Sequence, residues 1–159
     1  MATTQEYLLG SIATLLSTEL NSLASSSGLT AGVISSVGGS SGIFDNTAGG
    51  ALGGYVLGRI ELVLAAPAGA LTASTAAYIW FVRTADGTNY EDGGAAVIPA
   101  KPADVVIPVR AVSTAQRIEI DVVFLPFSKF YVLLAQNTGQ TWAASGNTVK
   151  LLPATYQGV

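Results

Sequence analysis

The stretch 117–126, RIEIDVVFLP, decides the fold class of this chain. Apolar and charged residues alternate along it, with Ile118, Ile120, Val122 and Phe124 on one side and Arg117, Glu119 and Asp121 on the other. Successive side chains of a β-strand point to opposite faces, so the alternation predicts a strand with one inward face and one wet face. A second stretch, 56–65, alternates in the same way.

Four further segments complete the predicted sheets. Segments 77–84 (AYIWFVRT) and 129–136 (KFYVLLAQ) are apolar on both faces. This suits central strands covered on both sides, or strands with one face in an interface near a partner. Segment 104–112 contains Pro108, which lacks a ladder donor and so favours an edge position, and 148–152 is a short final strand. Short strands joined by Gly, Pro and Asn turns predict a mainly β chain built as an antiparallel β-sandwich.

Composition divides the chain at residue 54. We expect residues 55–159 to form the sandwich domain, and residues 1–54 to form a separate N-terminal region that the sandwich does not need in order to fold. Within that region, segment 4–24 has apolar residues spaced by three and four, which predicts an amphipathic helix. The residues of this stripe are Leu8, Leu9, Ile12, Leu15, Leu16, Leu20 and Leu23.

Segment 25–54 is rich in Gly, Ser and Ala, a composition typical of flexible linkers. Apolar residues interrupt it, however, and a pure spacer has no need of them. We interpret the segment as an extended arm that orders when these residues contact a partner; a long loop folded over its own sandwich is an equally good interpretation. The candidate interface residues are Leu29, Val33, Ile34, Val37, Ile43 and Phe44.

The residue inventory excludes most chemistry. The chain has no His and no Cys, which removes an imidazole base, a thiolate nucleophile and the usual zinc or copper ligands. With 7 Lys and Arg against 10 Asp and Glu, it has no basic surface to hold a nucleic-acid backbone. We therefore expect no cofactor, no metal and no nucleic-acid partner.

The low charge and high hydropathy of the chain indicate either a membrane protein or apolar surface given to protein partners, and the second explanation is the better one. Only 11% of the residues are charged and the mean hydropathy is +0.50. The best apolar stretch, 62–82, is interrupted by Pro67 and Gly69, and a spanning helix needs about 20 apolar residues in succession. The first basic residue is Arg59, so we expect no signal peptide and synthesis in the cytoplasm.

Two motifs resemble reactive sites. Residues 38–42 match the G-x-S-x-G pattern of serine hydrolases around Ser40, but that chemistry needs a His, and we reject a hydrolase. The acidic residues Asp86, Glu91 and Asp92 offer oxygen ligands for calcium. Their spacing is not that of a calcium-binding loop, and a hairpin turn at Asp86-Gly87 explains them better.

Two aromatic residues fall in predicted loops. Tyr90 follows the Asp86-Gly87 turn, and Trp142 lies between two glycine-containing turns. An exposed Trp in such a loop is a frequent interface anchor, whereas a buried one caps the end of a sandwich. Both interpretations of Trp142 remain open at this point.

Several runs resemble a family of small virion proteins of tailed bacteriophages, the capsid cement or decoration proteins. The runs are ELNSLASSSGL, DGTNYEDG and AQRIEIDVVFLPFSKFYVLLAQNTGQTWAASGNTVKLLP. The resemblance is strongest in segment 115–153, whose closing pattern N-T-G-x-x-x-x-A-S-G-N-T-x-K contains no catalytic residue. It implies a jelly-roll sandwich with an N-terminal arm, a homodimer or homotrimer, and binding to the major capsid protein lattice on the outer surface of the virion.

The leading functional hypothesis is therefore a non-enzymatic capsid cement protein. The alternative is a β-sandwich module of a tail or fibre that binds a receptor or glycan through Tyr90, Trp142 and the loops around them. The low charge and the apolar arm fit contact with a protein lattice better than a fibre tip in water.

Overall fold

The computed structural model describes residues 5–25, 34–35, 43–47, 50, 54–93 and 97–158, which form a mainly β, antiparallel structure. The first of its two sheets, sheet A, has the order β1 (Gln5–Leu9), β10 (Thr148–Gly158), β5 (Leu57–Leu64) and β8 (Gln116–Phe124). β2 (Ala13–Leu16) also pairs with β10, so β1 and β2 occupy successive parts of the same strand position.

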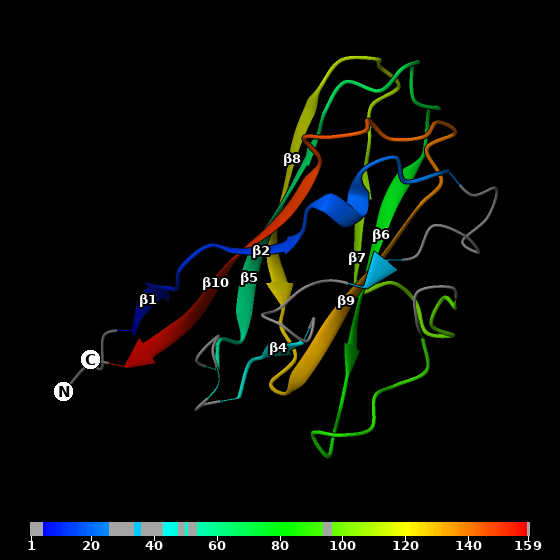
Figure 1. Ribbon diagram of the computed structural model, residues 1–159. Coiled ribbons are helices and arrows are strands. Elements are labelled where there is room, and N and C mark those ends of the chain that lie inside the picture. Colours follow the sequence, from blue (N-terminus) through cyan, green and yellow to red (C-terminus); the bar gives the residue numbers. More distant parts are fainter. Residues whose placement is uncertain are drawn as a thin grey trace.

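Sheet B has the order β3 (Ile34–Ser35), β9 (Lys129–Gln136), β6 (Ala76–Arg83) and β7 (Val105–Pro108). β4 (Phe44–Asp45) pairs with another part of β9. β7 is an edge strand, as the missing amide donor of Pro108 predicts, but it is shorter than the predicted segment 104–112. The two sheets lie face to face as a β-sandwich-like fold (Figure 1).

The strand pairings are nested. If β1 with β2 and β3 with β4 each count as one position, the first position pairs with the last, at β10, and the second with the next to last, at β9. Further in, β5 pairs with β8 and β6 with β7. Two further pairings, β10 with β5 and β9 with β6, join these nested pairs within each sheet of the described structure.

One hydrophobic core fills the space between the sheets. Inward residues of β5, β6 and β9 meet there, together with the leucines that follow β1. Its most deeply buried members include Leu15, Leu16, Leu20, Ile60, Leu62, Ile79, Phe81, Ile107, Phe130, Val132, Leu134, Val149 and Leu151.

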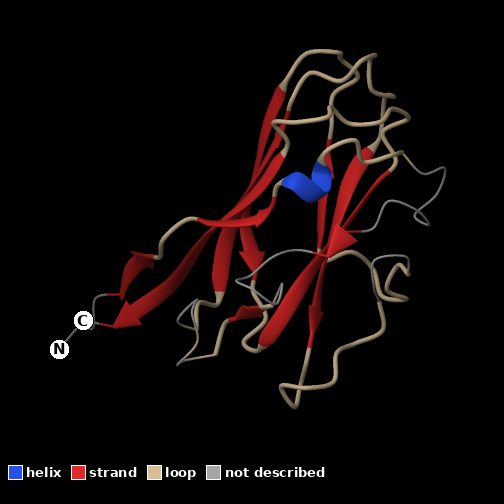
Figure 2. Ribbon diagram, in the orientation of Figure 1, coloured by secondary structure: helices blue, strands red, loops and turns tan. Residues whose placement is uncertain are grey.

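The helix predicted for segment 4–24 is wrong. Figure 2 shows strands in this region and a single short 3-10 turn, η1 (Thr18–Leu20), the only helix in the described part of the chain. The predicted apolar stripe is divided: Leu8, Leu9 and Ile12 are exposed, whereas the leucines from Leu15 onward are buried. Pairing with β10 satisfies the backbone in place of helical bonds.

Gly10 lets the chain pass close to β10 between the two short strands. Its backbone nitrogen donates to the carbonyl oxygen of Pro153, 2.8 Å away. A Cβ at this position would lie 2.7 Å from the Tyr55 ring and 2.9 Å from Pro153. The glycine therefore permits a close passage beside β10 that no other residue allows without displacement.

Residues 1–54 do not separate from the sandwich as predicted. Their described strands belong to both sheets, and Leu15, Leu16 and Leu20 contribute to the common core. Within the Gly- and Ser-rich segment, β3 and β4 lie on β9, which favours the loop folded over its own sandwich wherever the structure describes it.

Asn46 holds the end of β4 in place. Its Nδ2 donates to the carbonyl oxygens of Tyr55 at 2.6 Å and Pro126 at 2.7 Å, and its Oδ1 accepts from the Tyr55 nitrogen at 2.9 Å. The side chain is fully buried and all these bonds reach distant parts of the chain. One amide therefore joins β4, the start of β5 and the corner between β8 and β9.

β6 and β9 are covered on both faces by this chain itself. A second cluster on their outer face contains Trp80, Val82, Leu133 and Ala135, and the segment between β6 and β7 packs over it. Trp80 Nε1 donates to the Lys101 carbonyl oxygen at 3.1 Å. Of the two interpretations of these apolar strands, coverage on both sides by the chain itself is confirmed for Trp80, Val82, Leu133 and Ala135.

β8 departs from the alternation that predicted it. Val122 and Phe124 are 62% and 79% exposed, not inward as expected. The register against β5 shifts between Gly58 and Ile60, so that Arg59 stands opposite two residues of β8. Val122 has a φ of +58°, and this bulge turns the strand by one position.

Candidate functional site

Trp142 lies in the core of its own chain. It is 3% exposed, and its indole Nε1 donates to Thr138 Oγ1 at 3.2 Å. Its backbone nitrogen donates to the Leu23 carbonyl oxygen at 3.0 Å. Capping one end of the sandwich is therefore its role here, and its assignment as an exposed interface anchor is wrong.

Tyr90 is half-buried against the second apolar cluster. Its ring lies 5.2 Å from that of Tyr131, and its backbone forms a bridge with Thr84. Partial burial, and secondarily the negative charge of Asp45, raise the pKa of Tyr90. The ring thus packs under the turn and does not stand free beside Trp142.

The other candidate interface residues divide into two groups. Leu29, Val33 and Val37 lie outside the described residues. Ile34 begins β3, whose backbone pairs with β9, and Ile43 is half-buried. Phe44 is buried and stacks on Phe130 at 5.5 Å, so it belongs to the core and not to a free surface.

The motifs of possible chemistry have structural explanations or lie outside the described residues, as Ser40 does. Asp86 closes the predicted turn: its carboxylate accepts from the backbone nitrogens of Thr88 at 2.8 Å and Asn89 at 2.7 Å. These bonds, with those from the side chains of Asn89 and Thr84, hold the pKa of Asp86 well below its usual range. In the described part of the chain no three acidic side chains gather in a way that could hold a metal.

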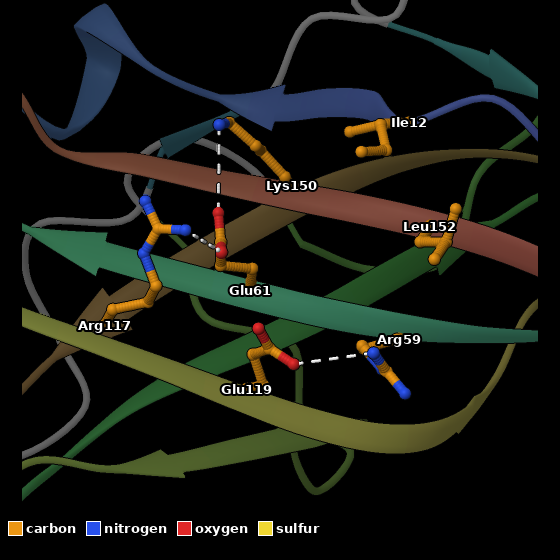
Figure 3. Close-up of a pocket in the computed structure, with 7 residues that line it drawn as sticks. All are labelled: Ile12, Arg59, Glu61, Arg117, Glu119, Lys150 and Leu152. Atoms are coloured by element: carbon orange, nitrogen blue, oxygen red, sulfur yellow. Dashed lines mark ion pairs between the residues drawn. The ribbon is translucent and has the colours of Figure 1, made fainter.

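A charged face covers the outer side of sheet A. It consists of Arg59, Glu61, Arg117, Glu119, Asp121 and Lys150, around a shallow hollow of about 290 Å³. Figure 3 shows Glu61 between Arg117, at 3.0 Å, and Lys150, at 3.8 Å. Arg59 contacts both Glu119, at 3.6 Å, and Asp121.

The charged face is a ladder of ion pairs. Glu61 and Glu119 stand directly opposite on β5 and β8. Each carboxylate of the face lies beside a cation, and the three cations balance the three anions.

A corner patch of exposed apolar residues lies where β8 turns into β9. It comprises Phe124 and Phe127, 79% and 59% exposed, with Val122, 62% exposed, before them. The bulge at Val122 exposes this patch, and the alternating sequence carries no sign of it, because the residue with positive φ is not a glycine.

A groove beside the corner patch runs between the two edge strands β7 and β8. It has a volume of about 360 Å³ and is lined by residues of both strands and by the Arg83–Asp104 ion pair, whose atoms are 2.7 Å apart. Val106, Val122 and Phe124 are its exposed apolar members. The groove and the corner patch together present exposed apolar side chains of β7, of β8 and of the corner that follows β8.

No protein-family description, curated protein or solved structure matches this chain significantly. Among the described residues no helix has the length and apolar character needed to cross a membrane.

Proposed function

We propose that this chain is a capsid cement protein, a structural virion protein that binds across neighbouring capsomers on the outer surface of a phage head. The observation that carries the proposal is the corner patch, an exposed apolar surface on a chain that has no His and no Cys. The resemblance of segment 115–153 to phage cement proteins supplies the identity of the partner, the major capsid protein lattice.

The nested strand order supports a jelly-roll sandwich as the finer description of the fold. A jelly roll has eight strand positions in two sheets, and pairing of the first position with the last is what results when a long hairpin is rolled up. The observed pairings follow that order. Jelly rolls are frequent in viral capsid proteins and also in lectins, so the fold alone does not choose between cement and glycan binding.

The size of the corner patch suits a repeated contact. Its two phenylalanines leave on the order of 250 Å² of aromatic surface in water. A stable interface buries about 800 Å² on each partner, so one patch alone binds weakly. Many copies on a symmetric shell gain avidity, and a protein that binds only the assembled shell stabilises it by mass action.

Nothing in the described structure favours the tail or fibre module through the residues first considered for it. Trp142 is inside the core and Tyr90 packs on Tyr131, so the pair does not form an open platform for a sugar. If the chain does not bind capsids, the tail or fibre module becomes the favoured function.

The test is co-sedimentation of the purified full chain with expanded capsids that lack it. The wild type is expected to bind saturably at a simple fraction of the number of major capsid subunits. The double variant Phe124→Ser/Phe127→Ser is expected to weaken binding at least about tenfold, because it removes the aromatic surface of the patch. Val97→Ser, which changes an exposed valine elsewhere, is the matched control.

Two results would overturn the proposal. Absence of saturable binding by the wild type would reject the cement function. Equal binding by the wild type and the phenylalanine double variant would remove the corner patch from the contact. Each variant is first compared with the wild type by circular dichroism, so that loss of binding is not confused with loss of folding.

A further inference from the structure

β8 has an edge that no described strand occupies. It is the last strand of sheet A and pairs on one side with β5. An edge strand presents backbone N–H and C=O groups to any extended chain that reaches it, and most edges are short or interrupted for that reason. β8 is long, Gln116–Phe124, and its regular part ends at the Val122 bulge.

The regular part of β8, residues 117–121, has the sequence RIEID, which is self-complementary about Glu119. If two copies paired antiparallel about an axis through Glu119, residue 117 of each would stand opposite residue 121 of the other. Arg117 would then face Asp121 on the outer side. On the inner side Ile118 would face Ile120, and these two residues are only partly buried in the single chain.

The charged side chains of β8 are largely exposed, although Arg117 and Asp121 each have an ion-pair partner on β5 of the same chain. The side chains of Arg117 and Asp121 are 66% and 68% exposed. Glu119 would meet its own copy on the axis, a repulsive pair on its own. Each Glu119 has Arg59 of the same chain at 3.6 Å, however. The charges that each copy brings to the contact, two arginines (59 and 117) and two acids (119 and 121), therefore sum to zero.

We propose that β8 is a homodimer interface, in which two copies join edge to edge through antiparallel β8–β8 pairing about a two-fold axis at Glu119. The contact merges two A sheets into one and covers Ile118 and Ile120. The bulge at Val122 limits the length of the pairing, so the dimer is reversible. Because opposite charges face each other across the contact, salt weakens the dimer. The inference does not rest on the proposed capsid function and is tested without capsids.

The experiment is sedimentation velocity of the purified full chain over about a hundredfold range of concentration, with reversed charges at the two facing positions. Arg117→Asp alone places two aspartates opposite each other at both contacts, and Asp121→Arg alone places two arginines there. Each single variant is expected to dimerise at least about tenfold more weakly than the wild type. The double variant restores both opposite-charge pairs and is expected to dimerise as the wild type does.

Mixing the two single variants is the most specific test of which residues face each other. A mixed dimer has an Asp facing an Arg at both contacts, so the mixture is expected to dimerise more strongly than either single variant does alone. Lys150→Glu is the matched control, because it reverses a charge on the same face of sheet A but on an inner strand. A monomeric wild type, or a dimer that the single variants leave unchanged, would overturn the proposal.

A second measurement checks the axis independently of charge. The chain has no cysteine, so Glu119→Cys introduces a unique thiol on the proposed axis. A short bismaleimide is expected to link two Glu119→Cys chains rapidly, whereas Lys150→Cys, two strands away from the edge, is expected to stay unlinked. Equal linking of the two variants would contradict the proposed register.

Discussion

The backbone nitrogen of Gly10 donates to the carbonyl oxygen of Pro153 at 2.8 Å, and this bond lies between the β1 and β2 pairings with β10. Gly10→Ala therefore distinguishes the strand from a helix. In a helix the change would stabilise by about 1 kcal/mol. In this structure the new methyl group meets Tyr55 and Pro153, and we expect the free energy of unfolding to fall by about 1–3 kcal/mol in urea titrations.

Gly69→Ala is the matched control for that measurement. A Cβ at Gly69 would meet only the end of the Gln140 side chain, at 3.3 Å, which can move aside. We expect this variant to stay within about 0.5 kcal/mol of the wild type. Stabilisation by Gly10→Ala would contradict the paired N-terminal strands.

Because of the backbone conformation of Val122, we expect an unusual result when this strand valine is changed to glycine. A β-branched residue with a φ of +58° is strained, and the side chain is largely exposed, so it contributes little packing. Val122→Gly is expected to raise the free energy of unfolding by about 1 kcal/mol. Val106→Gly, at an exposed valine of β7 without positive φ, is expected to lower it by about 1 kcal/mol. The same sign for both in chemical denaturation would show that the bulge stores no strain.

The sequence predicts the strands of the sandwich better than their ends or irregularities. Segments 56–65, 77–84 and 129–136 appear as β5, β6 and β9. Runs that alternate with period two, and short runs that are apolar on both faces, are compatible with few structures other than a strand. The helix predicted for segment 4–24 is wrong because leucines at helical spacing are also compatible with a chain that bends between two short strands. Only pairing with β10, 130 or more residues away, decides between these, and local periodicity contains no information about that partner.

Trp142 is expected to stabilise the fold. Because it is buried and bonded to Thr138, Trp142→Ala should lower the free energy of unfolding by about 3–5 kcal/mol. Trp142→Phe keeps most of the ring but leaves the indole bond unmade, and should cost about 1–2 kcal/mol. The control is Phe127→Ala, an exposed aromatic on the corner patch, which should change stability by less than about 0.5 kcal/mol in the same urea titration. Equal effects of Trp142→Ala and Phe127→Ala would contradict the burial of Trp142.

The candidate site was less predictable than the fold for a physical reason. Loop position suggested that Tyr90 and Trp142 were accessible, but exposure depends on which distant segment packs over a loop. Conversely, Phe124 lies in an alternating strand and was assigned to the core. A one-residue bulge reverses the faces beyond it, and Val122 gives no sequence signal for positive φ. Charge was the more reliable guide, because Arg117, Glu119 and Asp121 face water as the alternation predicts.

Asp86 makes stability depend on pH in the acid range. Hydrogen bonds from the backbone of Asn89 and Thr88 lower the pKa of Asp86 in the folded chain below its ordinary value of 3.8. A carboxyl whose pKa is depressed by folding contributes stability above its unfolded pKa, and this contribution is lost as the pH falls toward the folded pKa. We therefore expect the wild type to lose more stability than Asp86→Asn between about pH 6 and about pH 3 in urea titrations. Asp92→Asn, in the same loop, is the control and should follow the wild type. If Asp86→Asn loses as much stability on acidification as the wild type, the turn does not depend on the ionised carboxylate.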